Sequence, residues 1–128
     1  MDQEAMGKTG EKAAMIFLKE RGYEILAVNF KNSLGRRLGE IDIIAKEPAA
    51  RQLVFVEVKT RDFQKYQNTL PEENITCAKL KKLEKIAQFY LKINHLSEAD
   101  FRFDAISVLL DKENRKAQIR HLKNIYLK

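Results

Sequence analysis

The sequence predicts an α/β domain in which helices and strands follow the order α-β-β-β-α-β-β. Residues 4–21 and 76–94 carry apolar side chains at three- and four-residue steps, the spacing of one face of a helix. Five shorter segments are rich in β-branched and aromatic residues, as strands are. These segments are residues 23–30, 39–45, 53–59, 101–110 and 117–122. Because 128 residues suffice for one core, we expect a single domain over residues 1–128.

The composition is that of a chain that folds and stays in solution, with 45% apolar and 33% charged residues. No apolar run approaches the ~20 residues that a membrane-spanning helix needs, so we expect no membrane partner. Residues 1–4 lack the basic and then apolar pattern of a signal peptide. Cys77 is the single cysteine, which excludes an internal disulfide and a cysteine-rich zinc site. We therefore expect a cytoplasmic location.

The net charge of +6 is unevenly distributed, because the excess of Lys and Arg lies entirely in residues 76–128. Such an excess indicates a polyanionic partner, and nucleic acid is the first candidate. A solvated, lysine-rich surface explains the same charge equally well, so composition alone leaves both explanations open.

The first predicted helix has signals at both ends, since Asp2 can cap its start and Gly22 can end it. Gly7 and Gly10 lie inside the helix at a cost in helix propensity, which indicates close packing against another backbone. Glu11 lies at the edge of the apolar face. Taken alone, Glu11 is most simply explained as an ordinary exposed helix residue.

The first predicted strand, residues 23–30, leads into a predicted loop over residues 31–38 with a turn signal at Gly35. Arg36 and Arg37 fall just before the next strand, where they can reach a phosphate group of nucleic acid. They can equally be hairpin-tip charges that keep a sheet edge soluble.

The two central predicted strands, residues 39–45 and 53–59, carry charges where buried strands usually have none. An ionised side chain in an apolar sheet is costly unless it is paired, solvated or bound to a metal. Because side chains alternate between the faces of a strand, the first strand presents two different sets. One face takes Glu40, Asp42 and Ile44, and the other takes Ile41, Ile43 and Ala45.

The second central strand brings an acidic and a basic residue to one face. Glu57 and Lys59 are two positions apart, so they project side by side, together with Phe55. If the two strands form a hairpin across residues 46–52, Asp42 lies naturally near Glu57. Two carboxylates and one ammonium group then converge on one face of the sheet.

This convergence is typical of a divalent-metal site that acts on phosphate groups. Hard cations such as Mg²⁺ bind carboxylate oxygens, and a nearby lysine can orient water or offset developing charge. A structural ion pair of Glu57 with Lys59 or Arg61 is the alternative. The acidic residues Glu40 and Asp42 in the preceding strand favour the metal site.

The second predicted helix, residues 76–94, carries lysines on the face opposite its apolar stripe. The candidate contacts to a phosphate backbone are Arg61, Lys79, Lys81 and Lys82. Contacts of this kind would make binding strongly salt-dependent. A merely soluble helix face explains the same lysines equally well.

The last two predicted strands are joined by a turn over residues 111–115. Arg102 and Asp104 share one face of the first of these strands, which favours a structural ion pair over a pair of ligands. His95 and His121 are isolated in the sequence, and we assign neither a catalytic role.

Several short motifs along the chain, taken together, resemble one known family. They are Gly10-Glu11, Gly22-Tyr23, Asn29, residues 39–45, residues 54–61 and Arg102-Phe103-Asp104. In combination they resemble the YraN-type family of endonuclease-like proteins. That family belongs to the restriction-endonuclease-like PD-(D/E)xK superfamily and is similar to the archaeal Holliday-junction resolvases. The resemblance covers nearly the whole chain and implies a restriction-endonuclease-like fold, with a central five-stranded mixed sheet flanked by helices.

The resemblance also implies a catalytic site. Carried over by position, Asp42 and Glu57 are ligands of Mg²⁺ or Mn²⁺, and Lys59 is the catalytic lysine. Glu11 is the helix carboxylate that reaches toward the same site, as in the resolvases. Glu40, which precedes the key aspartate, is a weaker candidate.

From these observations we expect a metal-dependent endonuclease that acts on nucleic acid, with branched or structured DNA as the expected substrate. By analogy with the resolvases, a homodimer would suit a two-stranded cut. One alternative is a nucleic-acid-binding module that has the nuclease fold but little or no turnover. Another is a structural domain whose strand charges form simple ion pairs. The chain departs from the family pattern in residues 62–74 and 122–128, which concerns substrate or dimer contacts more than the metal site.

Overall fold

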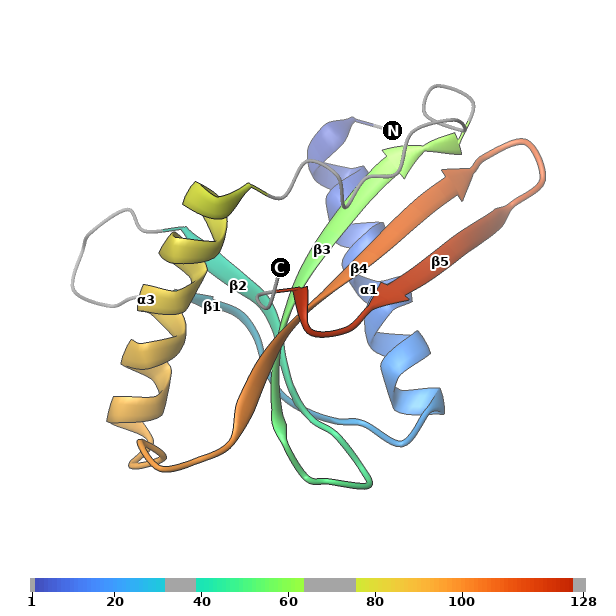
Figure 1. Cartoon of the computed structure of the whole chain (residues 1–128). Coiled ribbons are helices and arrows are strands. Elements are labelled where there is room, and N and C mark those ends of the chain that lie inside the picture. Colours follow the sequence, from blue (N-terminus) through green and yellow to red (C-terminus); the bar gives the residue numbers. More distant parts are fainter. Residues whose placement is uncertain (1, 32–38, 64–75, 126–128) are drawn as a thin grey trace.

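The computed structural model describes residues 2–31, 39–63 and 76–125 (Figure 1). Within these residues the elements are α1 (Gln3–Glu20), β1 (Glu24–Lys31), β2 (Glu40–Lys46), β3 (Leu53–Asp62), α3 (Cys77–Ile93), β4 (Phe101–Asp111) and β5 (Lys116–Leu122). Their order and type confirm the prediction, although β3 continues past its predicted end at Lys59. The predicted turn at Gly35 and most of the polar segment 62–74 lie outside the described residues.

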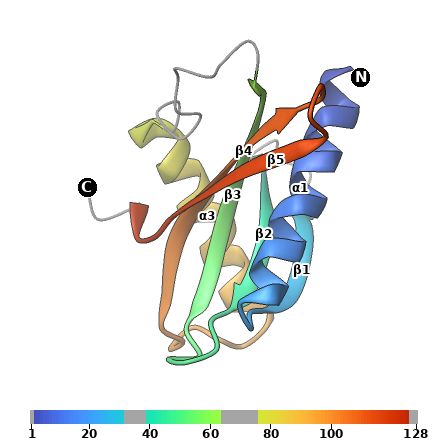
Figure 2. The same cartoon turned by 90° about the vertical axis from the view of Figure 1, so that its right-hand side faces the viewer.

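The strands form one mixed sheet in the order β1-β2-β3-β4-β5. All neighbours are antiparallel except β3 and β4, which run parallel and pair from Leu53 with Phe101 to Asp62 with Leu110. A parallel pair needs a crossover connection, and α3 lies in this one. Figures 1 and 2 place α1 on one face of the sheet and α3 on the other. The α/β class with a five-stranded mixed sheet flanked by two helices is thus confirmed.

Each face of the sheet buries one apolar cluster beneath its helix. The cluster under α1 contains Ala14, Leu18, Tyr23, Ile43, Ala45, Val54, Val56, Ile106, Val108 and Leu110. The cluster under α3 contains Ile41, Ile44, Leu53, Phe55, Leu83, Ile86, Ala87, Tyr90, Leu91, Phe103, Ala105 and Ile125. Burial of these side chains fixes both helices on the sheet. In the described parts of the chain, neither helix has the length and apolar character required to cross a membrane.

Capping residues account for where α1 and α3 begin, and a glycine accounts for where α1 ends. The Asp2 side chain accepts a hydrogen bond from the Ala5 backbone N–H at 2.7 Å, as an N-cap residue does. Thr76 caps α3 in the same way, since its Oγ1 accepts from the Lys79 N–H at 3.2 Å. Gly22 follows α1 with a φ of 87°, a left-handed conformation that favours glycine. The predicted roles of Asp2 and Gly22 are confirmed.

Gly10 allows α1 to approach β3 closely. A Cβ atom at this position would lie 1.8 Å from Oγ1 of Thr60, which is itself buried on β3. The predicted close packing is therefore confirmed for Gly10, although the partner is a side chain and not a backbone. The same prediction is wrong for Gly7, where a Cβ atom would meet no atom within 4 Å.

The strands β2 and β3 separate at Asp42. Their paired register covers only Ile43–Lys46 of β2, with Ile43 opposite Val56. The predicted face of Ile41 is wrong, because Ile41 packs in the cluster under α3, whereas Ile43 packs under α1. Strict alternation of side chains requires a regularly paired strand. Ile41 lies outside the part of β2 that pairs with β3, which begins at Ile43. The separation leaves Asp42 at the point where a space opens between two strands.

Candidate metal and nucleic-acid site

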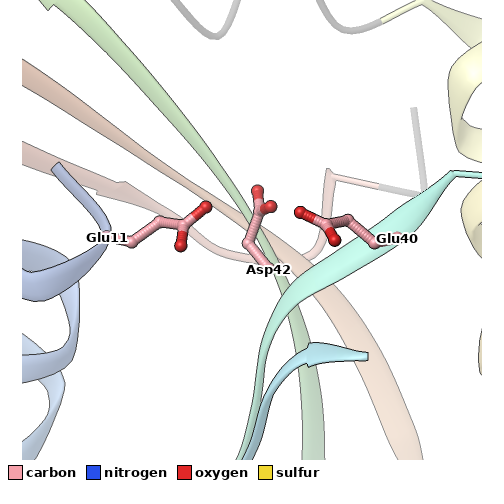
Figure 3. Close-up of side chains that lie close together, drawn as sticks. All are labelled: Glu11, Glu40 and Asp42. Carbon is pink, nitrogen blue, oxygen red and sulfur yellow. The ribbon is translucent and has the colours of Figure 1, made fainter. Parts of the chain in front are cut away.

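Three carboxylates from two elements meet beside the separation of β2 and β3. Figure 3 shows Glu11 from α1 and Glu40 and Asp42 from β2 pointing toward one another. Each offers a carboxylate oxygen, and these oxygens all lie within 4.8 Å of one another. This spacing is compatible with a single cation bound by all three side chains. The predicted approach of Glu11 to Asp42 is present in the structure.

Asp42 is the most strongly perturbed acid of this cluster. Its side chain is buried, with 8% exposed, and its Oδ2 accepts a hydrogen bond from the Val58 backbone N–H at 2.7 Å. Burial, followed by a hydrogen bond with Glu57 and the charge of that residue, raises the pKa of Asp42 to about 9. Asp42 therefore retains its proton at neutral pH unless a cation compensates the surrounding negative charge.

Glu57 lies on β3 and shares a pocket with Asp42. It is also buried, with 7% exposed, and its Oε2 is 3.2 Å from Nζ of Lys79 on α3. The pocket has a volume of about 410 Å³ and is lined by Gly39, Glu40, Asp42, Glu57, Thr76, Ala78, Lys79, Lys82 and Leu83. Acidic strand residues thus face the first turns of α3 across an open space. The predicted proximity of Asp42 and Glu57 is present.

Lys59 follows on the same strand and is half-buried. Burial, and then the hydrogen bond and charge of Lys79, lower the pKa of Lys59 to about 8, while the charge of Glu57 opposes this effect. For Lys79 the balance is reversed. Burial alone would lower its pKa, but contacts with Lys59 and Glu57 outweigh burial and raise it. Lys79 therefore pairs directly with Glu57, and the charge of Lys59 lies close to both.

Asn29 on β1 holds two of the carboxylates in place, a contact that sequence reasoning missed. In the amide orientation that satisfies its hydrogen bonds, its nitrogen donates to Glu11 Oε1 at 3.1 Å and to Glu40 Oε1 at 3.3 Å. The backbone of Asn29 has a φ of 51°, which asparagine tolerates better than most residues. An asparagine within a strand is unusual, and this was the available signal.

Glu40, predicted to be a weaker candidate than Asp42 and Glu57, is one of the three carboxylates that meet in the cluster. The predicted alternation already placed Glu40 on the same face as Asp42, and that signal was sufficient to find it. The pKa of Glu11 is raised, mainly by burial and further by the charges of Glu40 and Glu57. Hydrogen bonds with Asn29 and Asp42 oppose this rise. The two glutamates therefore add to the negative charge around Asp42.

The candidate contacts to nucleic acid are spread around this site. Lys79 and Lys82 line the pocket, and Lys81 is exposed on α3. Arg61 donates from Nη1 to the Thr60 carbonyl oxygen at 2.9 Å. Arg61 also lines a second pocket, with Gln3, Met6, Gly7, Glu11, Val58, Lys59 and Thr60. Arg36 and Arg37 lie outside the described residues.

The predicted ion pair of Arg102 and Asp104 is confirmed, with Nε of Arg102 3.0 Å from Oδ1 of Asp104. His121, although isolated in the sequence, has a partner in the fold, because its Nε2 is 2.7 Å from the other oxygen of Asp104. Burial would raise the pKa of Asp104, but hydrogen bonds from His121 and Arg102 outweigh burial and lower it. The network links β4 to the edge strand β5 and contains none of the three carboxylates of the cluster.

Comparison with known proteins identifies the family of this chain. It is 38% identical over 126 residues to a UPF0102 protein of Caldicellulosiruptor saccharolyticus, with 98% of this chain and 100% of the relative covered. It is 40% identical over 127 residues to a UPF0102 protein of Lachnoclostridium phytofermentans, with 98% and 96% covered. The family described as "Uncharacterised protein family UPF0102" matches residues 10–108. The chain therefore belongs to the uncharacterised protein family UPF0102.

Proposed function

We propose that this protein is a metal-dependent endonuclease that hydrolyses phosphodiester bonds in DNA, with branched or structured DNA as its expected substrate. One observation carries the proposal. Carboxylates of α1 and β2 cluster at the separation of β2 and β3, and Glu57 of β3, which contacts Asp42, pairs there with Lys79 of α3. Sites that cleave phosphodiesters combine hard oxygen ligands with positive charge in this way.

The residues present fit a divalent cation. Oxygens of Glu11, Glu40 and Asp42 lie within 4.8 Å of one another, and burial together with the neighbouring Glu57 raises the pKa of Asp42, so a bound cation would favour its ionised form. Their hard oxygen atoms match Mg²⁺ or Mn²⁺. We propose Asp42 and Glu57 as ligands, with Glu11 and Glu40 beside them. When bound, the cation would polarise a phosphoryl oxygen and lower the pKa of bound water.

The side chains of the protein contribute position and charge. The Val58 N–H holds the Asp42 carboxylate, so the orientation of this ligand is fixed by β3. The Lys59 ammonium can orient the attacking water and offset the negative charge that develops on the phosphate. Lys82 and Thr76, at the start of α3, line the same pocket, and a helix N-terminus beside a lysine can attract a phosphate group.

We also propose the finer family assignment, to YraN-type, restriction-endonuclease-like proteins. The arrangement of Asp42 at the separation of β2 and β3, with Glu57 two residues before Lys59, supports it. A cytoplasmic location and a homodimer that cuts two strands are further parts of this proposal.

Cleavage assays test the proposed activity. Junction, flap and single-stranded DNA substrates are incubated with Mg²⁺ or Mn²⁺ and with EDTA, and the products are separated on denaturing gels. We expect metal-dependent cleavage that falls at least about 100-fold in Glu57→Ala and in Lys59→Ala. The exposed substitution Glu98→Ala is the matched control and should retain the wild-type rate. Cleavage that is equal in all variants would refute the proposal, because a contaminating nuclease would explain it.

A nucleic-acid-binding module without turnover is the second candidate, and the exposed lysines of α3 favour it. Replacement of Lys81 and Lys82 by Gln should reduce the slope of log affinity for DNA against log salt concentration by about 1 to 2, the amount expected for one or two lost phosphate contacts. Binding with this salt dependence, but without cleavage in any metal, would select the module over the nuclease. An unchanged salt dependence would exclude α3 from phosphate contact.

A further inference from the structure

The contact between Lys79 and Glu57 joins two elements that are distant along the chain. Nζ of Lys79, on the first turn of α3, lies 3.2 Å from Oε2 of Glu57 on β3. The Glu57 side chain is 7% exposed, so its charge is poorly solvated and needs a partner. The ammonium of Lys79 supplies that partner.

The same contact is held less firmly than a simple buried ion pair. Lys79 also lies beside Lys59 on β3, so a second basic side chain stands close to the pair that Lys79 forms with Glu57. The side chain of Lys79 is 35% exposed and lies at the wall of the pocket, which leaves it a path toward solvent. Its backbone, in contrast, is fixed by the hydrogen bond to the N-cap Thr76.

We propose that Lys79 is an exchangeable counter-ion that occupies the place of the divalent cation at Glu57 and turns toward a DNA phosphate when that cation binds. The inference rests on the proposed function, because it assigns Glu57 to the cation. A lysine is suited to this exchange, since its ammonium is a point charge on a flexible four-carbon chain. The backbone anchor at Thr76 lets the side chain move while α3 stays in place.

The exchange couples the binding of cation and DNA. A cation that takes Glu57 releases Lys79 for the phosphate, and a phosphate that takes Lys79 releases Glu57 for the cation. Each ligand therefore strengthens the binding of the other, as linkage requires. Removal of Lys79 should therefore strengthen cation binding and weaken DNA binding. Removal of a lysine that merely stabilised the fold would not affect the two ligands in opposite directions.

The first test measures Mn²⁺ binding to the full-length protein without DNA, by calorimetry. We expect Lys79→Met to bind Mn²⁺ about 5-fold more tightly than wild type, because the competing ammonium is gone. Lys79→Arg retains the charge and should remain near the wild-type affinity. Lys85→Met removes the same charge from an exposed position farther along α3, and it should also bind as wild type does.

The second test measures DNA binding with a labelled duplex, in EDTA and in Ca²⁺, a hard cation with the same preference for oxygen ligands. In Ca²⁺, Lys79→Met should lower the salt slope of binding by about 1, the amount of one lost phosphate contact. In EDTA the slope should be unchanged, since Lys79 is then engaged with Glu57. A thermal unfolding scan completes the set, with a larger Mn²⁺-induced rise in Tm for Lys79→Met than for wild type.

The outcomes separate the two proposals. If wild type binds Mn²⁺ and Lys79→Met binds it equally or more weakly, the exchange is refuted while the metal site stands. The same conclusion follows if Lys79→Met lowers the salt slope equally in EDTA and in Ca²⁺. If wild type binds no Mn²⁺ at millimolar concentration, the metal site and the exchange are refuted together.

Discussion

Replacement of Asp42 by Asn should make the metal-free protein more stable while abolishing its cation site. The Asp42 carboxyl is buried among other acids, and its pKa rises from 3.8 to about 9 in the folded chain. The amide of asparagine has nearly the same size and can still accept the Val58 N–H bond. The amide is uncharged at every pH, so the cost of keeping the side chain at position 42 protonated disappears.

The magnitude follows from the raised pKa. The folded state holds the proton of Asp42 more tightly than the unfolded chain, so this group stabilises the fold less and less as pH rises from about 4 to 9. Each pH unit changes the free energy of unfolding by about 1.4 kcal/mol. At pH 7, keeping the carboxyl protonated costs up to about 4 kcal/mol, and Asp42→Asn removes this cost.

Urea unfolding in EDTA at pH 5, 6, 7 and 8 measures the effect. In EDTA, the difference in unfolding free energy between Asp42→Asn and wild type should grow with pH. In a separate series with Mn²⁺ in place of EDTA, wild type should gain stability and Asp42→Asn should not. Asp100→Asn, at an exposed position, is the control and should follow the wild-type curve. A difference that does not change between pH 5 and 8 would show that Asp42 is ionised in the metal-free fold, contrary to our reasoning.

Three further substitutions test the structure around the site. Asp104→Ala removes the acceptor of a buried network and should cost about 3–5 kcal/mol in urea unfolding, whereas a loss below 1 kcal/mol would contradict the network. Gly10→Ala puts a Cβ atom against Thr60 and should lower both Tm and Mn²⁺ affinity, since α1 carries Glu11. Unchanged Mn²⁺ affinity would show that Glu11 does not contribute to cation binding. Thr76→Ala should cost about 1 kcal/mol of stability through the lost N-cap, and an unchanged Tm would refute the cap.

The elements and the core of the site could be predicted because their signals are local. Periodicity located both helices and all five strands, and alternation put Glu57 and Lys59 on one face. The approach of Glu11 to Asp42 required the family resemblance, because nothing within α1 indicates which element its carboxylate faces.

The remaining contacts depend on packing between distant segments. Asn29 reaches Glu11 only because β1 lies beside β2 and under α1, and its left-handed backbone has no periodic signature. His121 meets Asp104 through the pairing of β4 with β5. Lys79 meets Glu57 through the crossover, so no spacing in the sequence predicts the contact.

The single parallel pairing in the sheet also bears on how the protein folds. The strands β2 and β3 form a local antiparallel hairpin, whereas β3 meets β4 only after the chain closes a long loop through α3. Loops of this length close late, since their entropy is lost before their contacts form. We therefore expect Asp42 and Glu57 to meet early in folding, and Lys79 to reach them with the docking of α3. Negative charge would thus gather before its compensating lysine arrives, so a divalent cation in the refolding buffer should speed the formation of the hairpin.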